Sequence, residues 1–186
     1  NTPEGLMLTE ETRTWVFDTL SADVIGQSNI LSSTNRDRSK VLLNNNRILN
    51  VTRNPSVGVV VLHHITGKPV ATRVYLLNQQ ESRKRLMDYL LEDIPNGHYV
   101  VLVFSREESQ NYHLEEWVTD SLAFGYNLFG VLETQGARQI RELEIAGSVP
   151  YVFTYKNGER VIGERIALPG EERGLLLFGY SFFNTE

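Results

Sequence analysis

The amino-acid sequence predicts an α/β fold: a compact two-layer or sandwich domain with a mixed sheet, hairpins and about three helices. Two apolar runs, the β-branched Val57–Leu62 and the run Tyr99–Phe104, predict strands that are buried on both faces. The amphipathic segment Glu81–Glu92 lies between them and predicts a helix. An Asn tract at 44–46 and the dipeptide Asn157-Gly158 are typical of hairpin turns.

Shorter patterns predict the remaining elements. The Ser-, Asn- and Arg-rich segment Gln27–Arg38 predicts a loop. Further strands are expected at Thr14–Phe17, Lys40–Leu43, Ile48–Thr52, Val70–Leu76, Val149–Tyr155, Arg160–Ile166 and Leu175–Phe183. Two more helices are expected at His113–Phe124, closed by Gly125, and at Gln135–Glu144. The inner stripe of the first of these is expected to contain Leu114, Trp117, Val118, Ser121 and Leu122.

Composition narrows the class of protein. The 186 residues are enough for one hydrophobic core, and 41% hydrophobic with 22% charged residues is ordinary for a globular protein. A net charge of −5 gives no electrostatic footprint for nucleic acid, and the apolar runs are too short for membrane insertion. The chain has no cysteine, which excludes disulfides and thiolate metal sites.

Motifs for common chemistries are missing from the sequence. It contains no nucleophile elbow, P-loop or G-x-G-x-x-G motif, so no cofactor is expected. His63 and His64 are adjacent at an expected strand end, where neighbouring side chains point to opposite faces and cannot easily chelate one ion. His98 follows a turn and is read as structural. The sequence therefore predicts no metal site.

One acidic loop is the candidate ligand-binding region. Glu107 and Glu108 directly follow the strand Tyr99–Phe104, and α/β folds commonly bind ligands at the carboxyl end of a central strand. The alternative is a solvated loop whose negative charge favours the start of the next helix. Tyr112 and Tyr126 flank that helix and are expected to be the most exposed aromatic residues. An exposed aromatic ring beside a carboxylate suits sugar binding.

The order of these motifs resembles a known family. The run Gly58–Leu62 leads into Ile65-Thr66-Gly67-Lys68-Pro69-Val70 and a helix, followed by Ile94-Pro95-Asn96-Gly97 and the second apolar strand. The acidic loop, Tyr112-His113-Leu114 and Val149–Phe153 come next. This series resembles the interleukin-like EMT inducer (ILEI/PANDER-type) domain, which occurs in cytokine-like proteins, in a glycosyltransferase stem and in large bacterial surface proteins.

The resemblance implies a domain over residues 20–168, preceded by an N-terminal extension or edge strand (1–19). A C-terminal strand (169–186) would dock onto a neighbouring domain. It also implies a non-catalytic binding module of a larger secreted or cell-surface protein, bacterial in view of the missing cysteines, that recognises carbohydrate. The implied ligand-binding residues are Glu107, Glu108, Tyr112 and His113. The family's R-D-x-W motif is replaced by Gly147–Tyr151, so an arginine contact is missing here.

Two other functions remain open at this stage. The chain could be a structural or protein-interaction domain that packs against neighbouring protein domains. It could also be a hydrolase that uses Glu107 and a second carboxylate, which for glycoside chemistry requires two carboxyl groups about 5–10 Å apart in one cleft.

Overall fold

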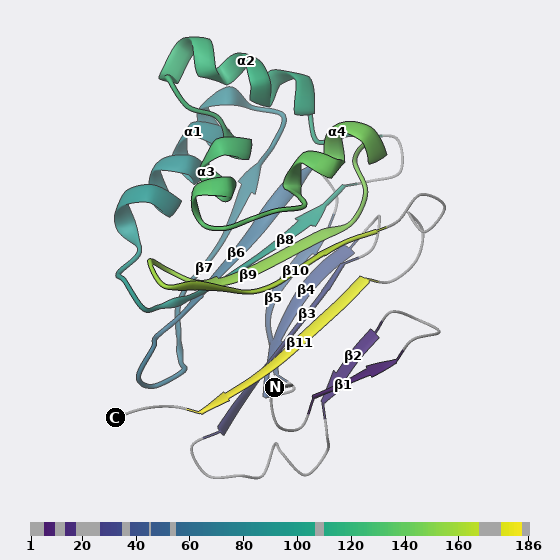
Figure 1. Cartoon of the computed structure of the whole chain (residues 1–186), viewed down its shortest axis with the longest axis vertical. Coiled ribbons are helices and arrows are strands. Elements are labelled where there is room, and N and C mark those ends of the chain that lie inside the picture. Colours follow the sequence, from purple (N-terminus) through teal and green to yellow (C-terminus); the bar gives the residue numbers. More distant parts are fainter. Residues whose placement is uncertain are drawn as a thin grey trace.

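Three layers make up the fold (Figure 1): helices, a five-stranded sheet and a four-stranded sheet. The computed structural model describes residues 6–9, 14–17, 27–34, 38–44, 46–52, 55–106, 110–167 and 176–183. A separate hairpin pairs β1 (Leu6–Thr9) with β2 (Thr14–Phe17), and β2 lies beside the last strand of the chain. The α/β class and the compact layered architecture expected from the sequence are confirmed.

The central layer is the five-stranded sheet. In spatial order it contains β10 (Arg160–Ile166), β9 (Tyr151–Lys156), β8 (Tyr99–Ser105), β6 (Ser56–Leu62) and β7 (Pro69–Leu76). All seven residues of β6 and of β8 are buried, as their apolar sequences predict. Val57, Val59 and Val61 face the helices, whereas Val60 and Leu62 face the second sheet. The two strands thus supply both hydrophobic cores through simple alternation of side chains.

Every strand pairing in the described residues is antiparallel, which differs from the expected mixed sheet. The cause is the path of the chain around β6. The β6–β7 hairpin places β7 on one side of β6, and the helical crossover returns β8 on the other side. Strands β7 and β8 therefore run parallel to each other, but β6 separates them.

The outer layer is the four-stranded sheet. It contains, in spatial order, β11 (Leu176–Phe183), β3 (Gln27–Thr34), β4 (Arg38–Leu43) and β5 (Asn46–Thr52). The β4–β5 hairpin confirms the prediction from the Asn tract, and Asn44 has the positive φ of 50° that such a turn needs. The loop expected at Gln27–Arg38 is wrong for residues 27–34, because backbone pairing with β4 and β11 on both sides outweighs the polar composition.

The helices cover the other face of the central sheet. They are α1 (Gln80–Asp88), which continues as the π-helical turn η3 (Tyr89–Asp93), α2 (Leu114–Phe124), α3 (Leu128–Thr134), the short 3-10 turn η4 (Ile140–Glu142) and α4 (Leu143–Ala146). The helix expected at Gln135–Glu144 is wrong for residues 135–139, which form a turn with Gly136 at a φ of 104°, whereas helical structure is present from Ile140 onward. Helix α3 was not predicted; Asn127 caps its start by accepting a hydrogen bond from the backbone N–H of Gly130. No helix in the described part of the chain combines the length and apolarity required to cross a membrane.

The buried face of α2 also differs from the prediction. Trp117 and Asp120 are buried, whereas Val118 and Leu122, which were expected inside, are 48% and 91% exposed. The helix buries the face that carries Asp120 because this carboxylate binds a buried arginine of α1. Helix α2 ends as predicted, at Gly125 with a φ of 82°.

Candidate functional site

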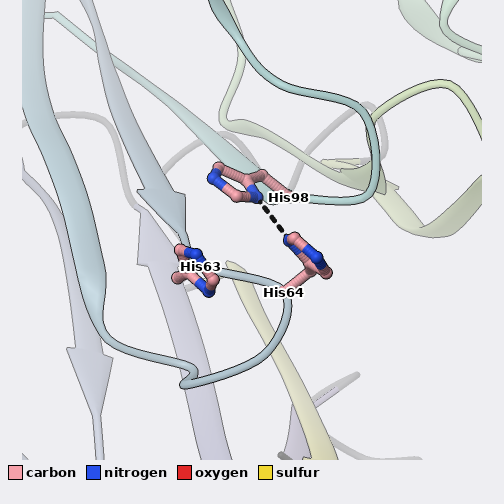
Figure 2. Close-up of side chains that lie close together, drawn as sticks. All are labelled: His63, His64 and His98. Atoms are coloured by element: carbon pink, nitrogen blue, oxygen red, sulfur yellow. Dashed lines mark hydrogen bonds between the residues drawn. The ribbon is translucent and has the colours of Figure 1, made fainter. Parts of the chain in front are cut away.

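Three of the four histidines meet at one end of the central sheet (Figure 2), which the sequence analysis did not foresee. Strand β6 ends at Leu62, so His63 and His64 lie in a turn and the expected alternation of their side chains does not apply. Their rings stack, with centroids 4.8 Å apart, and the ring of His98 lies beside both. Burial, followed by the charges of the other two rings, lowers the pKa of His98.

The residues expected to bind a ligand have different environments. Glu107 and Glu108 lie outside the described residues. Tyr112 was expected to be exposed but is 1% exposed, because its ring packs edge-on against Phe104 in the core. Its hydroxyl donates a hydrogen bond to the carbonyl of Val149, and burial raises its pKa. Tyr112 therefore cannot offer its ring to a sugar.

His113 lies at the start of α2 and borders a polar pocket. The pocket has a volume of about 310 Å³ and is lined by Asn111, His113, Leu114, Glu115, Glu116 and Ser148. His113 is partly exposed and has a φ of 59°, in the left-handed region. That conformation costs a residue other than glycine roughly 1–2 kcal/mol, and such strain is often found at functional sites.

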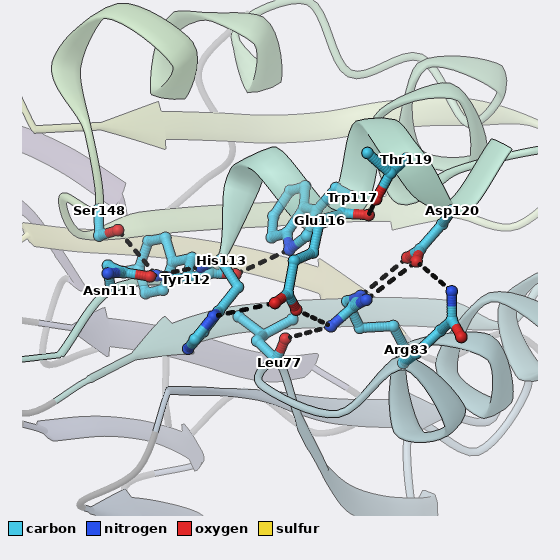
Figure 3. Close-up of polar contacts among 11 residues, drawn as sticks. Leu77, Arg83, Asn111, Tyr112, His113, Glu116, Trp117, Thr119, Asp120 and Ser148 are labelled. Atoms are coloured by element: carbon cyan, nitrogen blue, oxygen red, sulfur yellow. Dashed lines mark hydrogen bonds and ion pairs between the residues drawn. The ribbon is translucent and has the colours of Figure 1, made fainter. Parts of the chain in front are cut away.

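The loop before α2 is fixed by hydrogen bonds from both sides (Figure 3). The side chain of Asn111 accepts a bond from the backbone N–H of His113 at 2.9 Å. The hydroxyl of Ser148 accepts one from the N–H of Tyr112 at 2.8 Å, and the indole N–H of Trp117 donates to the carbonyl of Tyr112 at 2.8 Å. These bonds hold the polar groups of the pocket in place before any ligand arrives.

A buried ion pair next to the pocket holds one of the pocket residues in position. The guanidinium of Arg83 binds both carboxylate oxygens of Asp120 and also donates to the carbonyl of Leu77. It reaches further to Glu116, with 3.1 Å between Nη1 and Oε2 (Figure 3). Burial by itself would lower the pKa of Arg83, but the hydrogen bonds and charge of Asp120, with Glu116, raise it. Arg83 therefore stays charged.

Glu116 is the carboxylate that this network positions in the pocket. One of its oxygens is held by Arg83, and the other lies 3.8 Å from Nδ1 of His113. Its side chain is 52% exposed, so a ligand can reach it. Glu116 could not be recognised from the sequence because the arginine that holds it is 33 residues away in the chain. A weak signal was present in the spacing, since Glu116 and Asp120 are four residues apart on one helix.

No family model matches this chain, and no curated protein matches it. The resemblance to the ILEI/PANDER-type domain therefore stays a prediction.

The second tyrosine predicted at the ends of α2 lies away from the pocket. Tyr126 follows the C-terminal end of α2, is half-buried and donates a hydrogen bond to Asp88. It borders a more open hollow of about 440 Å³, together with Asn127 and Arg141. The two tyrosines therefore do not form one sugar-binding platform.

Proposed function

We propose that this chain is a non-catalytic binding module of a larger secreted or cell-surface protein, and that the pocket at the start of α2 binds carbohydrate. The observation that carries the proposal is the exposed carboxylate of Glu116, which buried Arg83 holds among Asn111, His113 and Ser148. The secreted context and the choice of carbohydrate rest on the family resemblance described above.

The chemistry of the pocket suits a ligand that is rich in hydroxyl groups. A carboxylate accepts hydrogen bonds from hydroxyls, while an amide and a serine hydroxyl both donate and accept. Glu116, Asn111 and Ser148 therefore offer several acceptors and donors within one concave surface. The ring of Tyr112 is buried, so we expect polar contacts to dominate over stacking.

The test is a glycan array probed with the labelled 186-residue chain, followed by titration of any hit. We expect saturable binding that Glu116→Gln weakens at least about tenfold, which corresponds to the loss of one charged hydrogen bond. Glu92→Gln is the matched control, because Glu92 is an exposed glutamate on η3 and outside the pocket lining. The absence of any glycan ligand, or binding that Glu116→Gln leaves unchanged, would contradict the proposal.

A specific observation favours the alternative of a protein-interaction domain. Val118 and Leu122 are one turn apart on α2 and both are exposed. If the glycan array is negative, Leu122→Glu, which places a charge on this apolar surface, provides the discriminating test in the parent protein. Loss of a native protein contact with unchanged folding of the domain would support this alternative.

A further inference from the structure

The histidine cluster has the geometry of a metal site and is separate from the pocket at α2. His64 and His98 come from segments that the sheet brings together, because Leu62 at the end of β6 pairs with Tyr99 at the start of β8. One ring nitrogen from each of His63, His64 and His98 lies within 4.8 Å of the others. The fourth histidine, His113, lies at α2 and is not part of this group.

Two of the ring nitrogens already point at one another (Figure 2). Nδ1 of His64 and Nδ1 of His98 are 2.9 Å apart. At this distance one nitrogen carries a proton and the lone pair of the other accepts it, so the two ring nitrogens face each other. A Zn²⁺ ion bonds to imidazole nitrogen at about 2.0–2.1 Å, which in tetrahedral geometry separates two ligand nitrogens by roughly 3.3 Å. A metal ion can replace the shared proton when the two nitrogens move apart by about 0.4 Å and the two rings tilt, so that both lone pairs converge on the ion.

His63 can become a third ligand only if its ring turns and gives up two hydrogen bonds. Its Nδ1 accepts hydrogen bonds from the backbone N–H groups of Ile65 and Thr66 at 3.1 and 3.3 Å. Its proton is therefore on Nε2 in this arrangement, and its ring must turn before a nitrogen lone pair can face the metal. Both bonds are long and exposed, so their loss is a small penalty. His63 is thus expected to contribute less than His64 or His98.

The surrounding loops hold His98 firmly and place a carboxylate nearby. His98 is 5% exposed, and its carbonyl accepts a hydrogen bond from the N–H of Asn157 at 2.9 Å. A Cβ atom added to Gly97 would lie 3.3 Å from a carboxylate oxygen of Glu159 and 3.6 Å from the ring of His64. The two side chains therefore lie beside the same short stretch of backbone, next to His98. Glu159 also contacts Lys156, at 3.4 Å. A carboxylate beside ligating histidines favours cation binding and orients the rings.

We propose that His64 and His98, with His63 as the third ligand, bind one divalent transition metal ion of the Zn²⁺ class. Clustered neutral imidazoles select zinc, copper, nickel and iron over magnesium and calcium, and the chain contains no thiolate that would compete. Three histidines leave the fourth tetrahedral position open to water or to another ligand. This site does not depend on the carbohydrate pocket, and either proposal can fail without the other.

The test is calorimetric titration of the chelator-treated 186-residue chain with ZnCl₂, supported by the visible spectrum of the Co²⁺ form. We expect one equivalent of Zn²⁺ to bind and to raise Tm. His64→Ala and His98→Asn should each weaken binding at least about tenfold, since each removes a ligand, and His63→Ala should weaken it less. His113→Ala is the matched control and should bind Zn²⁺ like the wild type.

Two results would overturn the proposal. One is the absence of saturable Zn²⁺, Co²⁺ and Ni²⁺ binding by folded wild-type chain, and the other is unchanged affinity in His64→Ala. If His98→Asn unfolds because His98 is buried, nitrogen-detected NMR of the wild-type imidazoles decides the matter. Zn²⁺ should shift the Nδ1 resonances of His64 and His98 but leave those of His113 unchanged, and failure to shift them would also overturn the proposal.

Discussion

The guanidinium group of Arg83 on α1 binds both carboxylate oxygens of Asp120 on α2, with distances of 2.8 Å from Nε to Oδ2 and 2.9 Å from Nη2 to Oδ1. Arg83 is 1% exposed and Asp120 is fully buried. A bidentate pair of this kind is geometrically specific, so it fixes how the two helices face each other. It also supports Glu116 and links the packing of the helices to the candidate binding pocket.

Breaking this pair should destabilise the protein strongly. Arg83→Met leaves the carboxylate of Asp120 buried without its cation, so we expect a loss of about 3–5 kcal/mol in the free energy of unfolding. Urea denaturation measures this loss. Lys84→Met on the same helix is the control, because the Lys84–Asp88 pair lies partly in solvent and should contribute much less to stability. Equal effects of the two changes would contradict the interpretation.

Gly58 permits the two sheets to approach closely. A Cβ atom at this position would lie 2.6 Å from Cδ2 of Leu49 and 2.8 Å from Cγ2 of Val51, both on β5. Gly58→Ala should therefore cost about 1–3 kcal/mol through overpacking. Gly130→Ala on α3 is the matched control, because its Cβ would meet only Asn127 at 3.7 Å and alanine favours helix. Chemical denaturation should show a lower free energy of unfolding for Gly58→Ala and a higher one for Gly130→Ala. A Gly58→Ala variant as stable as the wild type would refute the explanation.

Two buried tyrosine hydroxyls should respond differently to removal. Tyr112→Phe loses the hydrogen bond to the carbonyl of Val149 and should cost about 1 kcal/mol. The hydroxyl of Tyr155 has no hydrogen-bond partner within the described part of the chain, so Tyr155→Phe should be neutral or stabilising at pH 7. Thermal and urea denaturation of the two variants test this difference. The same loss of stability in both would contradict it.

Three buried tyrosines, Tyr112, Tyr151 and Tyr155, should make the fold less stable at alkaline pH. Burial raises the pKa of Tyr112 and Tyr155, and burial with the charge of Glu164 raises that of Tyr151. The unfolded chain therefore releases these protons at lower pH than the folded chain. Stability should be unaffected below about pH 10, the ordinary tyrosine pKa, and should fall as pH rises above it. Ultraviolet titration should detect ionisation of these tyrosines together with unfolding, and Tyr155→Phe should reduce the pH dependence.

Leu122 is exposed, although the sequence pattern predicts that it lies on the buried face of α2. Leu122 is 91% exposed, so Leu122→Ala should change stability by about 0.5 kcal/mol or less. Leu128 on α3 is fully buried, and Leu128→Ala should cost about 2–5 kcal/mol. Denaturation of the two leucine variants compares the same chemical change at an exposed and a buried position. A large loss for Leu122→Ala would place the inner face of α2 where the sequence pattern put it.

Much of the secondary structure could be predicted from local pattern. The strands β6 and β8, the β4–β5 and β9–β10 hairpins and the helix that begins at Gln80 follow from apolar runs, turn residues and helical periodicity. Strand β3 could not be predicted in this way, because its polar residues form a strand only through backbone pairing with β4 and β11. The candidate site was predicted in part: His113 borders the pocket, whereas Tyr112 belongs to the core.

The sequence by itself determined the α/β class and the strands buried on both faces, since side-chain periodicity and turn chemistry act over a few neighbouring residues. Only the tertiary structure decided which face of α2 is buried, which carboxylate enters the pocket and that His64 meets His98. The deciding partners are far apart in the chain, 37 residues for Arg83 and Asp120 and 34 for the two histidines. Their contact depends on the path of the chain around β6, which no local pattern encodes.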